Sequence, residues 1–592
     1  MLSRCALIFL LLGGRLAAWD MPADWPLNAP TPAQIAIVLA AADQEGWPAV
    51  APALRLKALR AYEANRPDAA GAWLGLARWA VLLGEPENHF VPRWIDAVVA
   101  ARANHANMPR SYHPPGTPLA AHAGRPLVAW LLGNPKFTDK FFGVLSPCDY
   151  LPAVLDILDQ IHTAEPARFQ TYAQLALAIA VVYDVPPPPG WPHGQVSQAA
   201  LPRRLPAPTE AFAFFAQADQ AGLTLQHLAR LDADVLKFVV DAAAPFPELK
   251  WAQQSVRFPL PDLVRSYEAV SYRLDRLQAA QNDWPGTTYT LPQILKEGGI
   301  CVDQAYFATE TGKARGVPTL LFAGAGVDSR HAWFGYLDGQ QHWQLDAGRY
   351  AEAKLVTGMA RDPQTWGILT DHELMYLADG FRGRATYPLS RLNTDIAAAY
   401  LAVGQAPAAV TAARKAANYE RLNSEAWETL LDAEHAAGAD ARTRETTLRE
   451  AALALEKFPD LNAQFRQRIA DSLRARGETS AADFEEKQIA RKYQDGRSDL
   501  GIATAVTAMQ RVGADQTVAE QMHVFGQLMN QIDHDAGTAF FDRVARPFVV
   551  RLNHEGHPTE ARAALAQTRN ALNPAADSQL DQEMGKLAAT LK

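Results

Sequence analysis

Cysteine is scarce in this chain, whose 592 residues contain only Cys5, Cys148 and Cys301. So few cysteines exclude a disulfide-stapled scaffold, in which many cysteines stabilise a short chain. The histidines are scattered, and neither an HExxH nor a CxxC spacing occurs. Because metal sites depend on such spacings, we expect no metal and no cofactor.

Long runs of one charge and long apolar runs are also missing. The net charge is -8 and no basic stretch is interleaved with aromatic residues, so a nucleic-acid partner is not expected. Beyond the amino-terminal leader, no run of about 18 apolar residues could form a transmembrane segment. The leader places Arg4 before an apolar stretch and small residues at Ala17 and Ala18. This pattern predicts a signal peptide cleaved near Ala18, and hence a protein exported to the periplasm or the extracellular space.

The length and the change of pattern along the chain predict several domains, most of them helical. Apolar residues recur at helical spacing in three regions, prolines cluster in one, and alternating strand patterns are confined to another. We expect a signal peptide (1–18), an N-terminal helical domain (19–185), a proline-rich linker (186–208), a helical segment (209–289), an α+β core (290–386) and C-terminal helical repeats (387–592).

The C-terminal region has a repeating helical pattern. Glycines that would end the first helix of each pair stand at Gly404, Gly438, Gly477, Gly513 and Gly556, with gaps of 34, 39, 36 and 43 residues. The stretch AAAYLAVGQAPAAVTAARKA resembles the paired helices of tetratricopeptide repeats. The resemblance implies an α-solenoid whose concave face binds a protein partner, and a scaffold that only supports the core is the alternative.

The stretch EGGICVDQAYFATETGKARGVP, residues 297–318, predicts a helix that begins at Cys301. Two glycines precede it, and Gly316 and Pro318 end it. The first turn of a helix has unpaired N–H groups and a partial positive charge. Both favour a thiolate over a thiol, so this position suits a nucleophilic cysteine.

The next stretch, HAWFGYLDGQQHWQLDAGRY, predicts a β-hairpin with a two-residue turn at Asp338-Gly339. That register places His331 directly opposite Asp346, close enough for the carboxylate to orient the imidazole. Trp333 and Gln344 share their face and are expected to line the site. Upstream, Gln293 is a candidate second oxyanion donor, with loop packing as the alternative role.

This part of the chain has, in order, a cysteine at a helix start, a helix that ends in RGVP, a strand, and then HAW followed by a strand that ends in aspartate. This order resembles the transglutaminase-like, papain-related superfamily core. The resemblance covers about residues 290–350. It implies Cys301 as the nucleophile, His331 as the base and Asp346 as the orienting acid. The chain departs from the common pattern in continuing the aspartate with Ala347-Gly348 instead of Pro-Thr. The expected architecture is therefore a multidomain, mostly α protein with a central α+β transglutaminase-like core.

The resemblance implies acyl transfer on a protein or peptide amide, cell-wall peptides included, through a thioester on Cys301. Water as the acceptor would make the chain a peptidase or amidase, and an amine would make it a transglutaminase. The sequence leaves both open. Two further alternatives remain, which are an inactive core serving as a protein-binding scaffold and a disulfide between Cys148 and Cys301.

Overall fold

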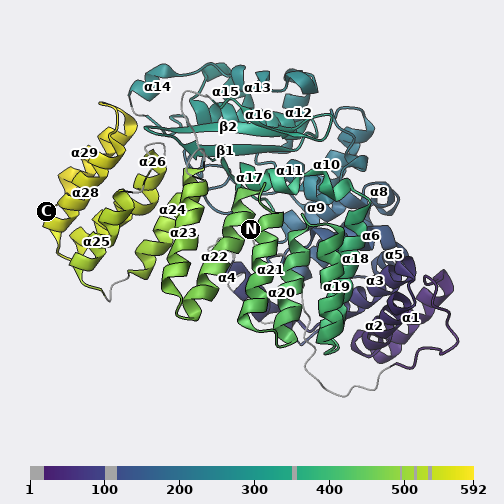
Figure 1. The fold of residues 1–592 in the computed structure, drawn as a ribbon. Helices are drawn as coiled ribbons and strands as arrows, with labels where there is room; N and C mark the ends of the chain where they lie inside the picture. The colour runs from purple at the N-terminus through teal and green to yellow at the C-terminus, as the bar shows by residue number, and fades with distance from the viewer. Residues whose placement is uncertain are drawn as a thin grey trace.

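The computed structural model describes residues 19–100, 116–279, 281–349, 357–493, 497–512, 516–530, 532 and 537–591. The predicted signal peptide lies outside these residues. The described chain is mostly helical with one small sheet, as expected, and no helix within it is both long and apolar enough to cross a membrane. Figure 1 shows the sheet and its covering helices on one side of the molecule and a curved row of helices on the other.

The N-terminal region is a set of short helices that often begin with proline, which lacks the N–H that a helix start leaves unpaired. Large aromatic side chains such as Trp73, Trp79 and Phe141 fill its core. The helices are α1 (Pro32–Glu45), α2 (Trp47–Glu63), α3 (Pro67–Gly84), α4 (Glu87–Ala100), η2 (Leu119–His122), α5 (Arg125–Gly133), α6 (Pro135–Val144), α7 (Leu151–Ala164), α8 (Pro166–Thr171) and α9 (Ala173–Tyr183).

The proline-rich segment 186–208 packs against the α+β core and is more than a spacer. The side chains of Trp191 and Leu201 are buried. The N–H of Trp284 donates to the carbonyl of Gln195 at 2.8 Å, and His193 Nε2 lies 3.1 Å from the hydroxyl of Tyr289. The segment thus packs on residues 284–289, just upstream of Cys301, which goes beyond the linker role that its composition predicts.

The core consists of one buried helix against a five-stranded antiparallel sheet of order β3-β2-β1-β4-β5. The preceding helices are α10 (Pro208–Gln220), η3 (Leu228–Arg230), α11 (Ala233–Val240), α12 (Phe246–Ser255), η4 (Leu260–Asp262), α13 (Arg265–Glu268), α14 (Leu274–Gln278) and α15 (Leu291–Glu297). The core elements are α16 (Cys301–Ala314), β1 (Thr319–Ala325), β2 (Arg330–Leu337), β3 (Trp343–Ala347), β4 (Met359–Arg361), β5 (Ile368–Thr370) and α17 (Asp371–Leu377).

Helix α16 is buried on all sides, because α12, α13 and α15 cover the surface that the sheet leaves uncovered. It therefore carries buried polar residues, among them Glu310, whose carboxylate accepts a hydrogen bond from the N–H of Ala244 at 2.9 Å. Burial raises the pKa of Glu310 to about 7, against a partly compensating attraction from Lys313. Only 1% of the Glu310 side chain is exposed.

This raised pKa predicts a pH-dependent stability. The folded state binds the Glu310 proton more tightly than the unfolded chain does. Protonated Glu310 therefore contributes fully to the folding stability below about pH 4.5, and this contribution is lost as the pH rises through about 7. The loss is on the order of 3 kcal/mol. Between pH 5 and pH 8, the free energy of unfolding in urea should fall less for Glu310→Gln than for the wild type. The exposed Glu555→Gln is the control, and equal pH dependence in all three proteins would contradict the assignment.

The hairpin register differs from the prediction. Leu337 pairs with Trp343 and Phe334 with Ala347, with an irregularity between Phe334 and Tyr336. The turn is longer than two residues because the Asp338 carboxylate accepts hydrogen bonds from the N–H groups of Gln340 and His342 at 2.8 and 2.9 Å. The predicted pairing of His331 with Asp346 is therefore wrong.

The C-terminal helices lie in sequence order in a curved row (Figure 1). Gly404, Gly438, Gly477 and Gly556 each follow a helix in the left-handed region, as predicted, and Gly513 lies outside the described residues. The elements are η6 (Gly380–Gly383), α18 (Thr386–Leu401), α19 (Ala406–Tyr419), α20 (Ser424–Ala436), α21 (Ala441–Ala454), α22 (Pro459–Ala475), α23 (Thr479–Lys492), α24 (Ser498–Arg511), α25 (Val518–Met529), α26 (Gly537–Phe540), the π-helical η8 (Phe541–Ala545), α27 (Arg546–His554), α28 (Pro558–Leu572) and α29 (Gln579–Thr590).

Both ends of this row contact the rest of the protein. At its start, α18 packs on α2 and α3, and Arg78 pairs with Asp395 at 2.8 Å. At its end, the N–H of Thr538 donates to the carbonyl of Gly326 in the turn between β1 and β2 at 3.1 Å. Figure 1 shows α26 beside the end of these two strands. The helical row therefore connects the N-terminal helices to the β1–β2 end of the core.

Candidate active site

Two glycines create the start of α16. Gly298 adopts a φ of +75°, which favours glycine, and a Cβ on Gly299 would lie 2.3 Å from the Cβ of Asp303. The absence of side chains lets Asp303 fold back, so that its Oδ2 accepts a hydrogen bond from the N–H of Ile300 at 2.9 Å. Cys301 is consequently the first residue of the helix, and its side chain is partly buried.

A buried polar cluster lies beside Cys301. The Asp303 carboxylate also accepts hydrogen bonds from Arg276 Nη1 and from the Tyr289 hydroxyl, both at 2.8 Å. The Asp303 side chain is 1% exposed and that of Arg276 is 2% exposed. Sequence reasoning missed this cluster, although an acid three residues into a helix start is a capping signal. The cluster therefore fixes the backbone next to Cys301.

The Cys301 sulfur contacts the strand that carries His331. Burial raises the pKa of the Cys301 thiol above its usual value, and the nearby backbone N–H groups of Ala332, Val302 and Cys301 itself lower it by less. The prediction that the helix start would favour a thiolate is therefore wrong, because burial outweighs the helix terminus. Cys148 and Cys301 are both free, so the alternative disulfide is not formed.

His331 is oriented by a backbone carbonyl. Its Nε2–H donates to the carbonyl oxygen of Gly348 at 2.7 Å, and its ring stacks against that of Trp333, with 6.2 Å between the centroids. This bond selects the tautomer protonated at Nε2, so that Nδ1 is the nitrogen that can accept a proton. Burial lowers the pKa of His331. A raised thiol pKa and a lowered imidazole pKa both favour a neutral Cys301–His331 pair.

The predicted orienting acid lies elsewhere. The Asp346 side chain is 72% exposed and its carboxylate pairs with Arg349 at 3.0 Å. Arg349 also contacts Asp371 at 3.2 Å and lies over the ring of Trp333. The Gly348 carbonyl, two residues further on, provides the hydrogen bond to His331 that was expected from Asp346.

Gly348 holds this carbonyl in place through a close contact. Its φ is +86°, and a Cβ would lie 2.8 Å from the ring of Tyr267. The Tyr267 hydroxyl donates to the carbonyl of Ala332 at 2.9 Å. Tyr267 therefore supports both the residue after His331 and the residue that orients it. The signal in the sequence was Ala347-Gly348, where the chain departs from the common pattern of the superfamily that it resembles.

The remaining predicted site residues have other roles. The amide nitrogen of Gln293 donates to Glu297 at 3.0 Å and its carbonyl oxygen accepts from Thr288, so both of its polar atoms bond to residues near it in sequence. Trp333 is fully buried and donates to the carbonyl of Leu345 at 2.7 Å. Gln344 is exposed and donates to Asp338 in the turn at 2.8 Å. Of these three residues, only Trp333 contacts a site residue, through its stacking on His331.

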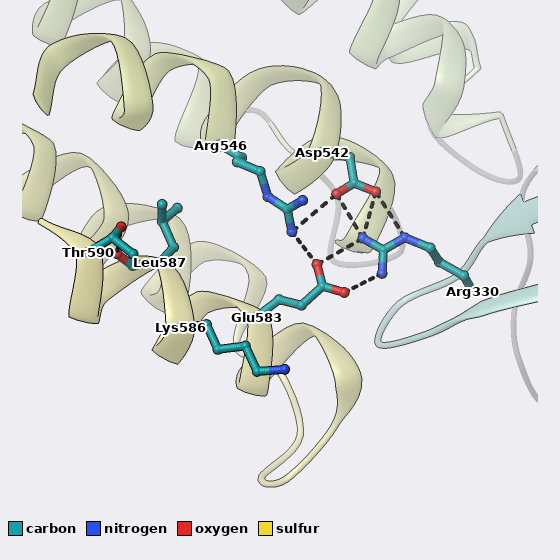
Figure 2. Close-up of a pocket in the computed structure, with 7 residues that line it drawn as sticks. All are labelled: Arg330, Asp542, Arg546, Glu583, Lys586, Leu587 and Thr590. Atoms are coloured by element: carbon teal, nitrogen blue, oxygen red, sulfur yellow. Dashed lines mark hydrogen bonds and ion pairs between the residues drawn. The ribbon is translucent and has the colours of Figure 1, made fainter. Parts of the chain in front are cut away.

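An ion-pair cluster joins the residue before His331 to the C-terminal helices. Figure 2 shows Arg330 reaching Asp542 and Glu583, with Arg546 bonded to the same Glu583. Arg330 Nη2 lies 2.8 Å from Asp542 Oδ2, and Arg330 Nη1 lies 2.6 Å from Glu583 Oε1. Arg330 and its partners also line an open cavity of about 670 Å³. Helix α29 and η8 thus hold the beginning of β2.

Removal of this cluster is expected to loosen the start of β2. Arg330→Ala should raise amide hydrogen exchange in the turn between β1 and β2 by about 5- to 30-fold, the change that about 1–2 kcal/mol of lost stability produces. Arg449→Ala is the matched control, because Arg449 also pairs with two carboxylates but lies within the helical row. Unchanged exchange in Arg330→Ala would show that backbone contacts alone hold the turn.

In the described part of the chain, no three histidine, cysteine or acidic side chains are grouped in a way that could hold a metal ion. Comparisons of the chain with family models, with curated proteins and with solved structures found no match. The functional argument therefore depends on the geometry around Cys301.

Proposed function

We propose that this chain is a cysteine-dependent acyl-transfer enzyme with a transglutaminase-like core, in which Cys301 is the nucleophile and His331 is the base. The observation that carries the proposal is the contact of the Cys301 sulfur with Ala332, the neighbour of a histidine whose Nε2 is held by Gly348. A cysteine at a helix start beside an oriented histidine is the arrangement that covalent catalysis requires. Asp346 has no direct part in the proposed mechanism.

The neutral pair suits general-base activation. As the sulfur attacks the carbonyl carbon of an amide, the thiol proton passes to Nδ1 of His331, and the developing oxyanion receives a hydrogen bond from the Cys301 N–H. The C–N bond then breaks, and the imidazolium gives its proton to the leaving amine. His331 next removes a proton from water or from an acceptor amine, which attacks the thioester. The Cys301 thiol is released together with an acid or a new amide.

The alternative is a protein-binding scaffold whose core has no activity. The raised pKa of Cys301 and the exposed Asp346 favour it. We also propose that the C-terminal helices form a tetratricopeptide-like array, supported by their sequential packing and their glycine stops. Export is proposed from the sequence of the leader alone.

The experiment that tests the enzyme proposal is intact-mass measurement after incubation with a panel of protein and cell-wall peptide amides. An acyl adduct is expected on the wild type and absent from Cys301→Ala, which keeps Cys148 as an internal control. A small primary amine added in excess should divert the product from the free acid to the amide if the enzyme is a transglutaminase. An adduct that persists in Cys301→Ala, or none with any amide, would support the scaffold.

The pKa directions predict how the thiol responds to pH. Iodoacetamide reacts with the thiolate, so alkylation of Cys301 should be slow at pH 7 and should still be rising above pH 9. Acyl transfer should instead increase as His331 loses its proton below pH 6.5 and then level off. Alkylation measured by mass on a Cys148→Ala background provides the check. A plateau reached below pH 8 would mean that a thiolate–imidazolium pair is present and that the neutral pair is wrong.

A further inference from the structure

A second cavity lies at the opposite end of β2 from His331. Its volume is about 740 Å³, within the range of ligand sites in proteins. One wall contains Leu337 at the end of β2 and Trp343 at the start of β3. Six residues separate His331 from Leu337 along the strand, a distance of about 20 Å at about 3.3 Å per residue. The cavity is therefore separate from the surroundings of Cys301.

The facing wall is built by alternate helices of the C-terminal row. Arg391 of α18, Glu425 and Glu428 of α20 and Phe465 of α22 line the cavity, whereas α19 and α21 contribute no lining residue. Residues at the start of α11 and along α6 complete the enclosure. Three parts of the chain that are distant in sequence therefore contribute to one hollow, which depends on the complete protein.

The cavity is acidic. Its lining contains eight carboxyl groups and four lysine and arginine side chains. Two of the carboxylates pair with cations outside the lining, Glu428 with Arg468 at 2.6 Å and Asp379 with Lys457 at 2.7 Å, which leaves an excess of two negative charges. Two of the cations are already paired, Lys237 with Asp362 at 2.9 Å and Lys140 with Asp232 at 2.6 Å. An enclosed site lined mainly by one sign of charge concentrates ligands of the opposite sign.

Apolar surface stands beside these carboxylates. Ile368 is 56% exposed although it lines the cavity, and Trp343 packs edge-on against Phe238, with 5.4 Å between the ring centroids. Lysine and arginine bury their methylene stems on apolar surface while their charged ends reach acidic groups, and they also interact favourably with aromatic faces. A small inorganic cation would leave this apolar surface uncovered.

We propose that this cavity binds a peptide segment that carries lysine or arginine beside apolar residues. It is a binding site for a basic protein or peptide, about 20 Å along β2 from His331. The proposal does not depend on the activity of Cys301, because the residues that carry it lie outside the candidate active site.

Fluorescence anisotropy with the full chain tests the proposal. The probe is a labelled eight-residue peptide of alternating lysine and leucine, compared with a glutamate–leucine peptide of the same length. We expect the lysine peptide alone to bind, and its affinity to fall at least tenfold when salt rises from 50 to 500 mM. The double variant Asp139→Asn with Glu425→Gln should weaken binding at least tenfold, whereas Asp68→Asn with Glu555→Gln, which removes two acids outside the cavity, should not.

Equal binding by the two double variants would overturn the proposal, because the attraction would then come from the overall charge of the protein. Equal binding of the glutamate peptide would also overturn it. If spermine displaced the labelled peptide at the same concentration as the unlabelled peptide does, the cavity would be a polyamine site and the peptide proposal would be wrong. Cys301→Ala should bind as the wild type does, so failure of the proposed enzyme activity leaves this result intact.

Discussion

Gly348→Ala is expected to lower acyl transfer by Cys301 about 100-fold or more while the protein stays folded. A Cβ at this position would enter the ring of Tyr267 and strain a backbone with φ of +86°. The carbonyl that orients His331 would shift, and a displacement of about 1 Å from productive geometry costs about 10²-fold in rate. The rate of acyl-adduct formation, measured by intact mass under single-turnover conditions, gives the comparison.

Two controls separate this effect from simple destabilisation. Gly380→Ala places a methyl group where no atom lies within 4 Å, so its rate should match the wild type. Asp346→Asn should also keep most of the rate, because its carboxylate is exposed and pairs with Arg349. If Asp346→Asn were as damaging as Gly348→Ala, the carboxylate would act directly on His331 and the carbonyl assignment would be wrong.

Asp303→Ala is expected to cost about 3–5 kcal/mol of folding free energy, the usual effect of removing one partner of a buried ion pair. The change leaves Arg276 charged and buried, removes the acceptor of Tyr289, and frees the N–H of Ile300. Because that N–H stands next to Cys301, the thiol should also lose its fixed position. Urea unfolding, together with the adduct rate at low temperature, measures both effects.

Asp275→Ala is the matched control, since Asp275 is an exposed acid paired with Arg273, and its loss should leave the stability close to that of the wild type. The double variant Asp303→Leu with Arg276→Met removes both buried charges and should recover much of the stability. It should not recover the adduct rate, because the cap on Ile300 is still missing. A loss below about 1 kcal/mol in Asp303→Ala would show that the cluster contributes little.

The sequence predicted the elements that depend on local signals. The glycines before Cys301 and the Gly316–Pro318 stop place α16 correctly, and four glycines mark helix ends in the C-terminal row. The hairpin strands were also predicted, but their register was not. A two-residue turn at Asp338-Gly339 competes with a longer turn capped by the Asp338 carboxylate, and the choice depends on hydrogen bonds that spacing alone does not reveal.

The parts that sequence reasoning missed depend on distant partners. Asp303 meets Arg276 from 27 residues earlier, and Gly348 matters because Tyr267 lies against it. The thiol pKa was predicted in the wrong direction because the helix start is a local feature, whereas burial depends on which other elements cover it. Periodicity identifies buried faces of helices and strands, but it cannot say which distant side chain meets which.

The contact between the C-terminal helices and the β1–β2 turn has a consequence for biosynthesis. Arg330 finds its partners Asp542 and Glu583 only 212 and 253 residues later in the chain. At a translation rate of about 5–20 residues per second, the strand bearing His331 leaves the ribosome roughly 10–50 seconds before the last of those partners is made. A nascent chain can therefore form α16 and the sheet early, while Arg330, the residue next to the proposed base His331, still lacks its ion pairs. Final anchoring of β2 is thus coupled to completion of the polypeptide. A chain truncated before α29 would keep the contact of His331 with Gly348 and the pair of Arg330 with Asp542, but it would lose the pair of Arg330 with Glu583.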